Sequence, residues 1–193
     1  MLIRLIRIPH SLGFGVQSPS AYYFIKYVIE EKLPYYLYDD LQIKFPDVKT
    51  ENRKFYKLCF RIANYAQASD IMIIGDHDSV LTSYIRSACK KAVVNFSSCN
   101  DFTNNINLKK IDNIDILISD VSYIDPQTIE SLLQLCIEKS ILIFTGIRND
   151  KKSVQVWKSL VNDNAISDSF DLYDYGIITF MDKQSKGNYS INF

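Results

Sequence analysis

The hydrophobic positions of the chain change their spacing near residue 70. Over residues 50–66 they recur every three or four residues, which is the spacing of one face of a helix. That face comprises Phe55, Leu58, Cys59, Ile62 and Ala63. A shorter helix is expected over residues 21–32, because Ser18 and Pro19 suit an N-cap and a first helical position and Pro34 ends the pattern. Between the two helices, the tyrosine-rich stretch PYYLYDDL predicts a turn.

From residue 70 onward, short apolar runs alternate with helical patterns, which is typical of a largely parallel sheet. We expect strands over residues 70–75, 92–97, 114–119 and 140–145, and helices over residues 79–91, 126–138 and 150–162. The unbroken apolar run from Ile71 to Ile74 predicts that the first strand is central and buried on both faces. Two extended runs joined by Tyr173 to Gly176 predict an antiparallel hairpin that closes the sheet.

The composition narrows the class of protein. A chain of 193 residues can form one domain with a sizeable core, so we expect a helical arm over residues 1–68 and an α/β core over residues 69–193 within one compact domain. The 22 basic and 22 acidic residues cancel and form no basic run, which argues against a nucleic-acid partner. No apolar run reaches the roughly 18 residues of a membrane span, so no membrane partner is expected.

The four cysteines favour a reducing environment. Cys59, Cys89, Cys99 and Cys136 lie far apart and form no C-x-x-C pair, which is typical of small buried thiols rather than of disulfides. The N-terminal stretch MLIRLIRIPH has two arginines within its apolar run and no cleavage site of the signal-peptide type. We therefore expect a cytoplasmic protein.

The stretch IMIIGDHDSV is the first candidate for a binding site. Four apolar residues run into Gly75, and the polar turn after it leads to a helical pattern. This is the order of strand, turn and helix that seats nucleotides in many α/β proteins. The turn carries Asp76, His77 and Asp78, whereas such turns are usually rich in glycine.

Three interpretations of this polar turn stay open. Its side chains form the floor of a pocket, or they bind a metal together with Asp120, or the turn is solvated and Asp78 or Ser79 caps the next helix. A metal site needs three or more converging ligands, and adjacent residues rarely point the same way. We therefore favour the helix cap over the metal.

Four stretches carry a family resemblance: RKFYKLCFRIANYAQASDIMIIG, IDILISD, ILIFTGIRNDKKSVQVWKSL and SFDLYDYGIITF. In this order they are similar to the helix and first strand, the fourth strand, the fifth strand with its helix, and the closing hairpin of class I S-adenosylmethionine-dependent methyltransferases, in particular small-molecule O-methyltransferases. The resemblance covers residues 50–182. It implies an α/β, Rossmann-like methyltransferase fold with a mainly parallel sheet, a C-terminal antiparallel hairpin and an N-terminal helical arm. It also places Gly75 and Asp120 at cofactor-binding positions.

Elsewhere the chain departs from that family at the positions that hold the cofactor. Ile73 stands where an acidic residue usually precedes the first glycine by two places. His77 and Ser79 stand at the later glycine positions, where a bare backbone approaches the cofactor. The stretch FSS at residues 96–98 stands where the family has a carboxylate that accepts hydrogen bonds from the ribose hydroxyls.

Two further departures concern the adenine and a metal. Residues 99–113 are expected to form at most a loop with a helical turn or one short strand, which leaves the adenine side open or collapsed. Thr145 and Gly146 stand where metal-dependent members of the family carry an acidic pair, so no metal is expected.

The N-terminal arm has candidates of its own. His10 is either a general base or a packing residue, and we favour packing because no partner can be assigned to it. Gly13 and Gly15 resemble a phosphate loop only weakly, since no strand precedes them. The tyrosines of the arm are Tyr22, Tyr23, Tyr27, Tyr35, Tyr36 and Tyr38. We expect most of them to be buried over the sheet, with one or two left for a contact, for which a homodimer is one candidate.

Our leading hypothesis is a methyltransferase-like protein in which binding of S-adenosylmethionine is impaired or lost, and which acts as a binding or interaction domain for a protein or small molecule. Its cofactor is then either absent or S-adenosylmethionine. The alternative is an active S-adenosylmethionine-dependent methyltransferase acting on a small molecule, with Asp76 or Asp78 replacing the missing acids. A third interpretation is a different α/β nucleotide binder, in which Ser97, Ser98 and Asn100 contact the ligand.

Overall fold

A computed structural model describes residues 16, 18–98, 113–180 and 186–193. His10, Gly13, Gly15 and Asn100 lie outside these residues, and so does nearly all of the segment 99–113. Within the described part of the chain, no helix is both long enough and apolar enough to cross a membrane.

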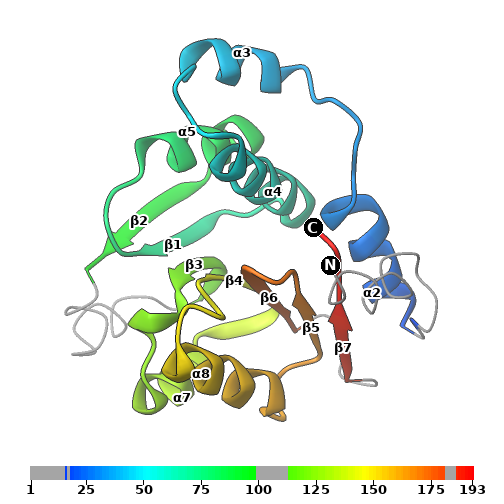
Figure 1. Ribbon diagram of the computed structural model, residues 1–193, viewed down its shortest axis with the longest axis vertical. Helices are drawn as coiled ribbons and strands as arrows, with labels where there is room; N and C mark the ends of the chain where they lie inside the picture. The colour runs from blue at the N-terminus through cyan, green and yellow to red at the C-terminus, as the bar shows by residue number, and fades with distance from the viewer. Residues whose placement is uncertain (1–15, 17, 99–112, 181–185) are drawn as a thin grey trace.

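The strands form one seven-stranded mixed sheet (Figure 1). They are β1 (Asp70–Ile74), β2 (Val93–Ser97), β3 (Ile114–Asp120), β4 (Cys136–Thr145), β5 (Asp168–Asp171), β6 (Tyr175–Thr179) and β7 (Gly187–Ser190). Their order across the sheet is β2-β1-β3-β4-β6-β5-β7. The first four strands are parallel, β6 is antiparallel to β4 and β5, and β7 is parallel to β5. The prediction of a mainly parallel α/β sheet is confirmed.

Strand β1 is an interior strand, as its apolar run predicts, although it lies second from the β2 edge of the described sheet rather than at its centre. It pairs with β2 on one side and β3 on the other, and Ile71 to Ile74 are all buried. The β5–β6 hairpin is also confirmed, but the expectation that it closes the sheet is wrong. Strand β7 adds to β5 and forms that edge. Its sequence GNYS is short and polar, with only Tyr189 buried, so no hydrophobic pattern marks it.

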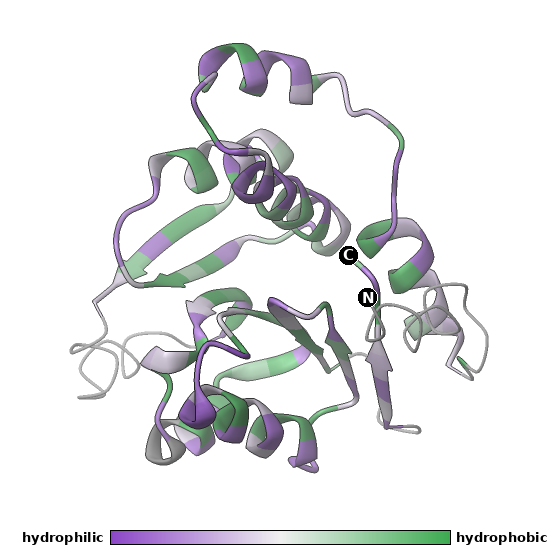
Figure 2. Ribbon diagram, in the orientation of Figure 1, coloured by the Kyte–Doolittle hydropathy of each residue, from purple (hydrophilic) through white to green (hydrophobic). Residues whose placement is uncertain are grey.

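The helices cover both faces of the sheet. They are α2 (Pro19–Phe24), which continues as the π-helix η1 (Ile25–Ile29), then α3 (Leu37–Lys44), α4 (Thr50–Ala66), α5 (Ser79–Ala88), the 3-10 helix η3 (Val121–Tyr123), α7 (Pro126–Gln134) and α8 (Lys151–Asn162). Figure 1 shows α2, α4 and α5 on one side and α7 and α8 on the other. Hydrophobic residues run along the central strands, while α4 and α8 alternate hydrophobic and hydrophilic residues (Figure 2).

Successive side chains of a strand point to opposite faces of the sheet, so each face has its own hydrophobic cluster. The two clusters pack the helices onto the sheet. Ile71 and Ile73 belong to a cluster with residues of α2, α4 and α5, whereas Met72 and Ile74 belong to a cluster with residues of α7 and α8. The predicted apolar face of α4 is buried in the first cluster. Trp157 of α8 is buried in the second, as predicted.

Three boundaries differ from the prediction. The first helix ends at Ile29 rather than near residue 32, and its last five residues form a π-helix. The helix expected over residues 126–138 ends at Gln134, and β4 begins at Cys136. Here the Ser140 hydroxyl donates to the Ile114 carbonyl (2.5 Å) and accepts from the Ile137 amide (2.7 Å), which ties the segment to β3.

The tyrosine-rich turn contains a helix instead. Helix α3 starts at Leu37, and it buries Tyr38 and Leu41, which are three residues apart. The Tyr38 hydroxyl donates to the Lys57 carbonyl of α4 at 3.3 Å. Only two side chains of α3 are buried, so the helix has no continuous hydrophobic face that the sequence could reveal. Its position depends on the contact with α4.

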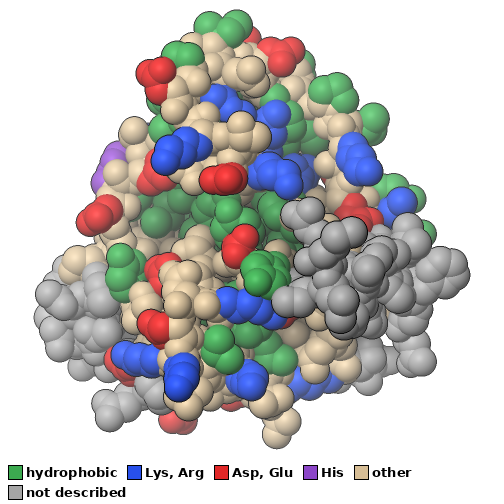
Figure 3. Space-filling view, viewed as in Figure 1, with side chains coloured by type: hydrophobic (Ala, Val, Ile, Leu, Met, Phe, Trp, Pro, Cys, Tyr) green, Lys and Arg blue, Asp and Glu red, His purple; other side chains and the backbone are tan. Residues whose placement is uncertain are grey.

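The expectation that most tyrosines of the arm are buried is wrong. Tyr22, Tyr23 and Tyr27 are 44%, 51% and 51% exposed, and Tyr36 is 80% exposed, whereas Tyr38 is buried. The reason is that the opposite side of α2 and η1 already supplies the apolar contact with the core. On the face of the molecule in Figure 3, hydrophobic side chains lie exposed next to Lys, Arg, Asp and Glu side chains.

Arg61 joins the arm to α4. Its guanidinium is buried, and it donates to the carbonyls of Val28 (2.6 Å) and Ile29 (3.0 Å) at the end of η1. The last carbonyls of a helix have no partner within the helix, and burial without one is costly. Arg61 therefore satisfies two acceptors that the core would otherwise leave unpaired.

We predict that Arg61→Met lowers the free energy of unfolding by about 2–4 kcal/mol, because both carbonyls stay buried and lose their donor. Urea denaturation followed by circular dichroism measures this. The matched control is Arg86→Met at the exposed end of α5, with an expected change below about 0.5 kcal/mol. Equal effects of the two substitutions would show that the Arg61 contacts are not stabilising.

Candidate functional site at the carboxyl edge of the sheet

The candidate residues gather where the parallel strands end. The last residue of β1, Ile74, pairs with Ser97 of β2 and Ser119 of β3, and Asp120 pairs with Thr145 of β4. The amide of Gly75 donates to the Ser97 carbonyl at 3.0 Å. The turn at residues 75–78 and Asp120 thus lie at the same edge, which is where α/β folds bind ligands.

Gly75 is covered by an aromatic ring. Its φ of +125° is a conformation that other residues rarely adopt. A Cβ atom at Gly75 would lie 3.0 Å from Cε2 of Tyr123, so the Tyr123 ring packs directly against the glycine. Tyr123 ends η3, the short helix that follows β3. The bare backbone of the turn therefore faces a side chain of the same protein.

The Asp120 carboxylate accepts three hydrogen bonds within the chain. Its Oδ1 accepts from the Ser122 amide (2.9 Å) and the Ser122 hydroxyl (2.6 Å), and its Oδ2 accepts from the Thr145 hydroxyl (3.0 Å). Gly146 has a φ of +68°, and a Cβ there would lie 2.6 Å from Asp120 Oδ2. The carboxylate caps η3 and joins β3 to β4, so it also sets the position of Tyr123.

Asp78 is the N-cap of α5, which confirms that prediction. Its Oδ1 accepts from the amides of Val80 and Leu81, both at 2.9 Å. Its Oδ2 accepts from the hydroxyl of Tyr56 on α4 at 2.7 Å. Burial, together with this hydrogen bond, raises the pKa of the Tyr56 phenol. The sequence pattern gives no reason to pair Tyr56 with Asp78, because the two are 22 residues apart and on different elements.

Asp76 and His77 point to solvent. Both side chains are exposed, and Asp76 makes no hydrogen bond with the described residues. The His77 ring packs on Phe96, with 4.4 Å between the ring centroids. Phe96 is at the end of β2, where the resemblance implies a carboxylate for a ribose. An imidazole on an aromatic ring supplies no acceptor equivalent to that carboxylate.

Within the described ranges, no group of three His, Cys, Asp or Glu side chains could hold a metal ion. The residues at this edge also do not fit S-adenosylmethionine in the manner that the resemblance implies. Every carboxylate oxygen of Asp78 and Asp120 already accepts a hydrogen bond within the chain. The Tyr123 ring also packs against Gly75, the position at which the resemblance implies cofactor binding.

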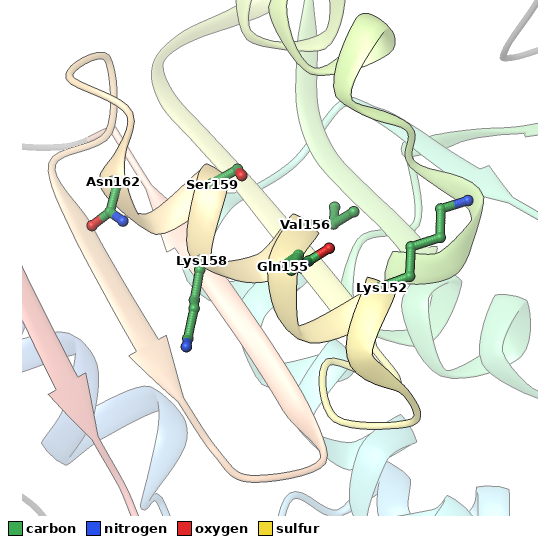
Figure 4. Close-up of a pocket in the computed structure, with 6 residues that line it drawn as sticks. All are labelled: Lys152, Gln155, Val156, Lys158, Ser159 and Asn162. Carbon is green, nitrogen blue, oxygen red and sulfur yellow. The ribbon is translucent and has the colours of Figure 1, made fainter.

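A surface groove of about 430 Å³ lies elsewhere, along α8 (Figure 4). It is lined by Lys152, Gln155, Val156, Lys158, Ser159 and Asn162. In Figure 4, the side chains of Lys152 and Lys158 extend in different directions from the helix. Their charges do not converge on one ligand, so this groove is not a candidate for catalysis.

Comparisons with known proteins bear on the fold. No family model matches the chain, and no curated protein sequence matches it. Among solved structures, the MycE methyltransferase of the mycinamycin biosynthetic pathway, in complex with Mg and SAH, matches with a TM-score of 0.56 at 13% identity. The match covers 95% of this chain and 58% of MycE, so the chain spans little more than half of that protein's length. An O-methyltransferase from Bacillus cereus, in complex with SAH, has a TM-score of 0.46 at 14% identity over 79% of this chain and 94% of its own.

The class of fold follows from the strand order and the MycE match together. The chain has the Rossmann-like α/β fold of class I S-adenosylmethionine-dependent methyltransferases. The resemblance noted in the sequence is confirmed at the level of the fold.

We predict that Asp78→Ala lowers the free energy of unfolding by about 2–4 kcal/mol, since it removes a helix cap and leaves the buried Tyr56 hydroxyl without its acceptor. Asp76→Ala, two residues earlier and exposed, should change it by less than about 0.5 kcal/mol. Thermal and urea denaturation of both variants measure the difference. A stable Asp78→Ala variant would mean that this side chain is kept for a ligand rather than for the fold.

Proposed function

We propose that this chain is a methyltransferase-like protein in which S-adenosylmethionine binding is impaired or lost, and that it acts as a binding or interaction domain. The observation that carries the proposal is the contact of the Tyr123 ring with Gly75, fixed by the hydrogen bonds of Asp120. The carboxylates of Asp78 and Asp120 at this edge already accept hydrogen bonds within the chain.

The hydrogen bonds of Asp120 give the proposal its energetic support. Ser122 and Thr145 already fill three of the roughly four acceptor positions of this carboxylate, and a ligand hydroxyl at one of those three positions displaces a donor of the chain. Hydrogen bonds to a charged group contribute about 1.5–3 kcal/mol each, so exchanging one for a ligand contact yields little net affinity. The ribose side has no replacement acid, because residues 96–98 read Phe, Ser and Ser.

The turn after β1 adds a steric argument. A cofactor approaching Gly75 must displace the Tyr123 ring, which is packed against the second hydrophobic cluster. His77 and Ser79 carry side chains where the family's backbone is bare, and Ile73 is buried rather than acidic. These features weaken binding independently of one another.

The second candidate function is an active S-adenosylmethionine-dependent methyltransferase that acts on a small molecule. Exposed Asp76 and His77 favour it, because both are at the carboxyl edge of a methyltransferase fold and neither is committed to a hydrogen bond with the described residues. In this case Asp76 supplies the carboxylate that the family usually has at the position of Ile73.

We propose that the protein is cytoplasmic. Cys59, Cys89 and Cys136 are free thiols, which fits a reducing compartment. Burial raises the pKa of the Cys136 thiol to about 12, so this cysteine stays protonated and unreactive at neutral pH.

Calorimetric titration of the full chain with S-adenosylmethionine and with S-adenosylhomocysteine tests the proposal. We expect dissociation constants of about 1 mM or weaker, since each missing charge-assisted contact costs roughly tenfold or more. Tyr123→Ala uncovers Gly75 and should strengthen any residual binding, whereas Asp76→Ala should leave it unchanged.

Asp47→Ala is the matched control, because Asp47 is exposed on the turn before α4. Low-micromolar binding by the unmodified chain, lost in Asp76→Ala and kept in Asp47→Ala, would overturn the proposal. The active methyltransferase would then be the better account.

A further inference from the structure

Helix α8 turns one polar face away from the sheet. Its apolar side chains Val156, Trp157 and Leu160 are buried in the second hydrophobic cluster. The exposed residues of the helix include three cations and no acid, and they are Lys151, Lys152, Gln155, Lys158, Ser159 and Asn162. We call these six residues the lysine face. Because the whole chain has 22 basic and 22 acidic residues, the lysine face is a local separation of charge.

Two of these lysines occupy positions that are unfavourable for the helix itself. Lys151 and Lys152 are its first two residues, and its first turn contains no acid. The amino end of a helix carries a partial positive charge, so cations there destabilise it. Helices α3 and α4 follow the usual rule, since their first turns contain Asp39 and Asp40 in α3 and Glu51 in α4. Proteins depart from such local rules mainly at functional sites, and an anion that binds along α8 would offset the repulsion.

Two surface hollows meet on the lysine face. One is the groove of about 430 Å³ described above, and the other, of about 500 Å³, extends toward Arg148. Gln155 and Lys158 line both of them. Among the described residues that line the two hollows, Asp150 is the only acid, and its Oδ1 caps the helix by accepting from the Ser153 amide at 2.7 Å. The hollows therefore form one predominantly positive surface along α8.

The arrangement of this surface indicates which class of anion fits. In Figure 4, Lys152 and Lys158 extend in different directions, so they suit separate acids better than one phosphate or carboxylate. Three lysines are few for a nucleic acid, whose binding often involves roughly six or more phosphates. None of the exposed residues of α8 is apolar, so the face lacks the side chains that enter a lipid surface. The amide and hydroxyl groups between the lysines, those of Gln155, Ser159 and Asn162, can hydrogen-bond to a peptide backbone.

We propose that the lysine face binds an acidic segment of another protein, whose spaced carboxylates pair with Lys151, Lys152 and Lys158. The 12 residues of α8 span about 18 Å, so an extended segment of about five or six residues covers the helix. The inference goes beyond the proposed function. It uses none of the residues that the cofactor proposal invokes, and it holds whether or not S-adenosylmethionine binds.

NMR titration of the full chain with an acidic peptide tests the inference. The probe is a peptide in which Glu alternates with Gly and Ser, and the same peptide with Lys in place of Glu is the charge control. We expect the amide signals of residues 151–162 to shift with a dissociation constant of about 100 μM at low salt, because each exposed ion pair contributes little. High salt should weaken the binding, since it screens exposed charges.

Charge reversal tests the role of the lysines. Lys152→Glu combined with Lys158→Glu should weaken peptide binding about tenfold, because two attractive contacts become repulsive. The matched control is Lys90→Glu combined with Lys91→Glu, which makes the same change in net charge at two exposed residues before β2 and should leave the binding intact. Lys152→Glu alone places an acid in the first turn of α8, so its thermal unfolding midpoint should not fall. Loss of binding in this variant is then not a loss of the fold.

Three results would each overturn the inference. The first is an acidic peptide that leaves the α8 signals in place, and the second is equal weakening by the two pairs of substitutions. The third is tighter binding of a single-stranded oligonucleotide or of anionic lipid vesicles at the same lysines. None of these results depends on the calorimetric titration with S-adenosylmethionine, so the two proposals fail separately.

Discussion

The carboxylate of Asp120 fixes the carboxyl edge of the sheet, and the candidate site depends on it. By accepting hydrogen bonds from Ser122 and Thr145, it holds the end of β3 against β4 and starts η3. The short helix then places the Tyr123 ring on Gly75. Gly146 permits this arrangement because it has no Cβ where Asp120 approaches. One acid thus links β3, β4 and the short helix whose Tyr123 ring packs on Gly75.

Much of the fold can be predicted from the sequence because burial leaves a clear pattern in the central elements. The run Ile71–Ile74 is apolar throughout, since β1 lies between two strands and under helices on both faces. The apolar face of α4 is equally clear. The hydrophobic pattern does not predict the elements whose position depends on tertiary contacts. Helix α3 buries only two side chains and β7 buries one. Strand β4 begins in a stretch whose Glu138 and Lys139 are exposed.

The candidate site is predictable in part. The sequence identifies the turn after β1, the cap at Asp78 and the place of Asp120, because each is next to a recognisable strand end. It does not identify Tyr123 or Tyr56, although an aromatic residue three positions after Asp120 is a signal that could have been read. Their roles depend on contacts between separate elements, such as Tyr56 with Asp78. The exposure of Tyr22, Tyr23 and Tyr27 does not follow from the pattern for a related reason, because other side chains of α2 and η1 already make the contact with the core.

We propose that the Tyr123 ring and the hydrogen bonds of Asp120 close the nucleoside position beside Gly75. The most direct measurement is the amide NMR signal of Gly75 during titration with S-adenosylhomocysteine, because this amide lies at the point where the cofactor would approach. The account predicts that the Gly75 signal stays in place up to millimolar ligand. A saturating shift of Gly75 and Asp76 at micromolar ligand, with loss of the Tyr123 ring contact, would contradict it.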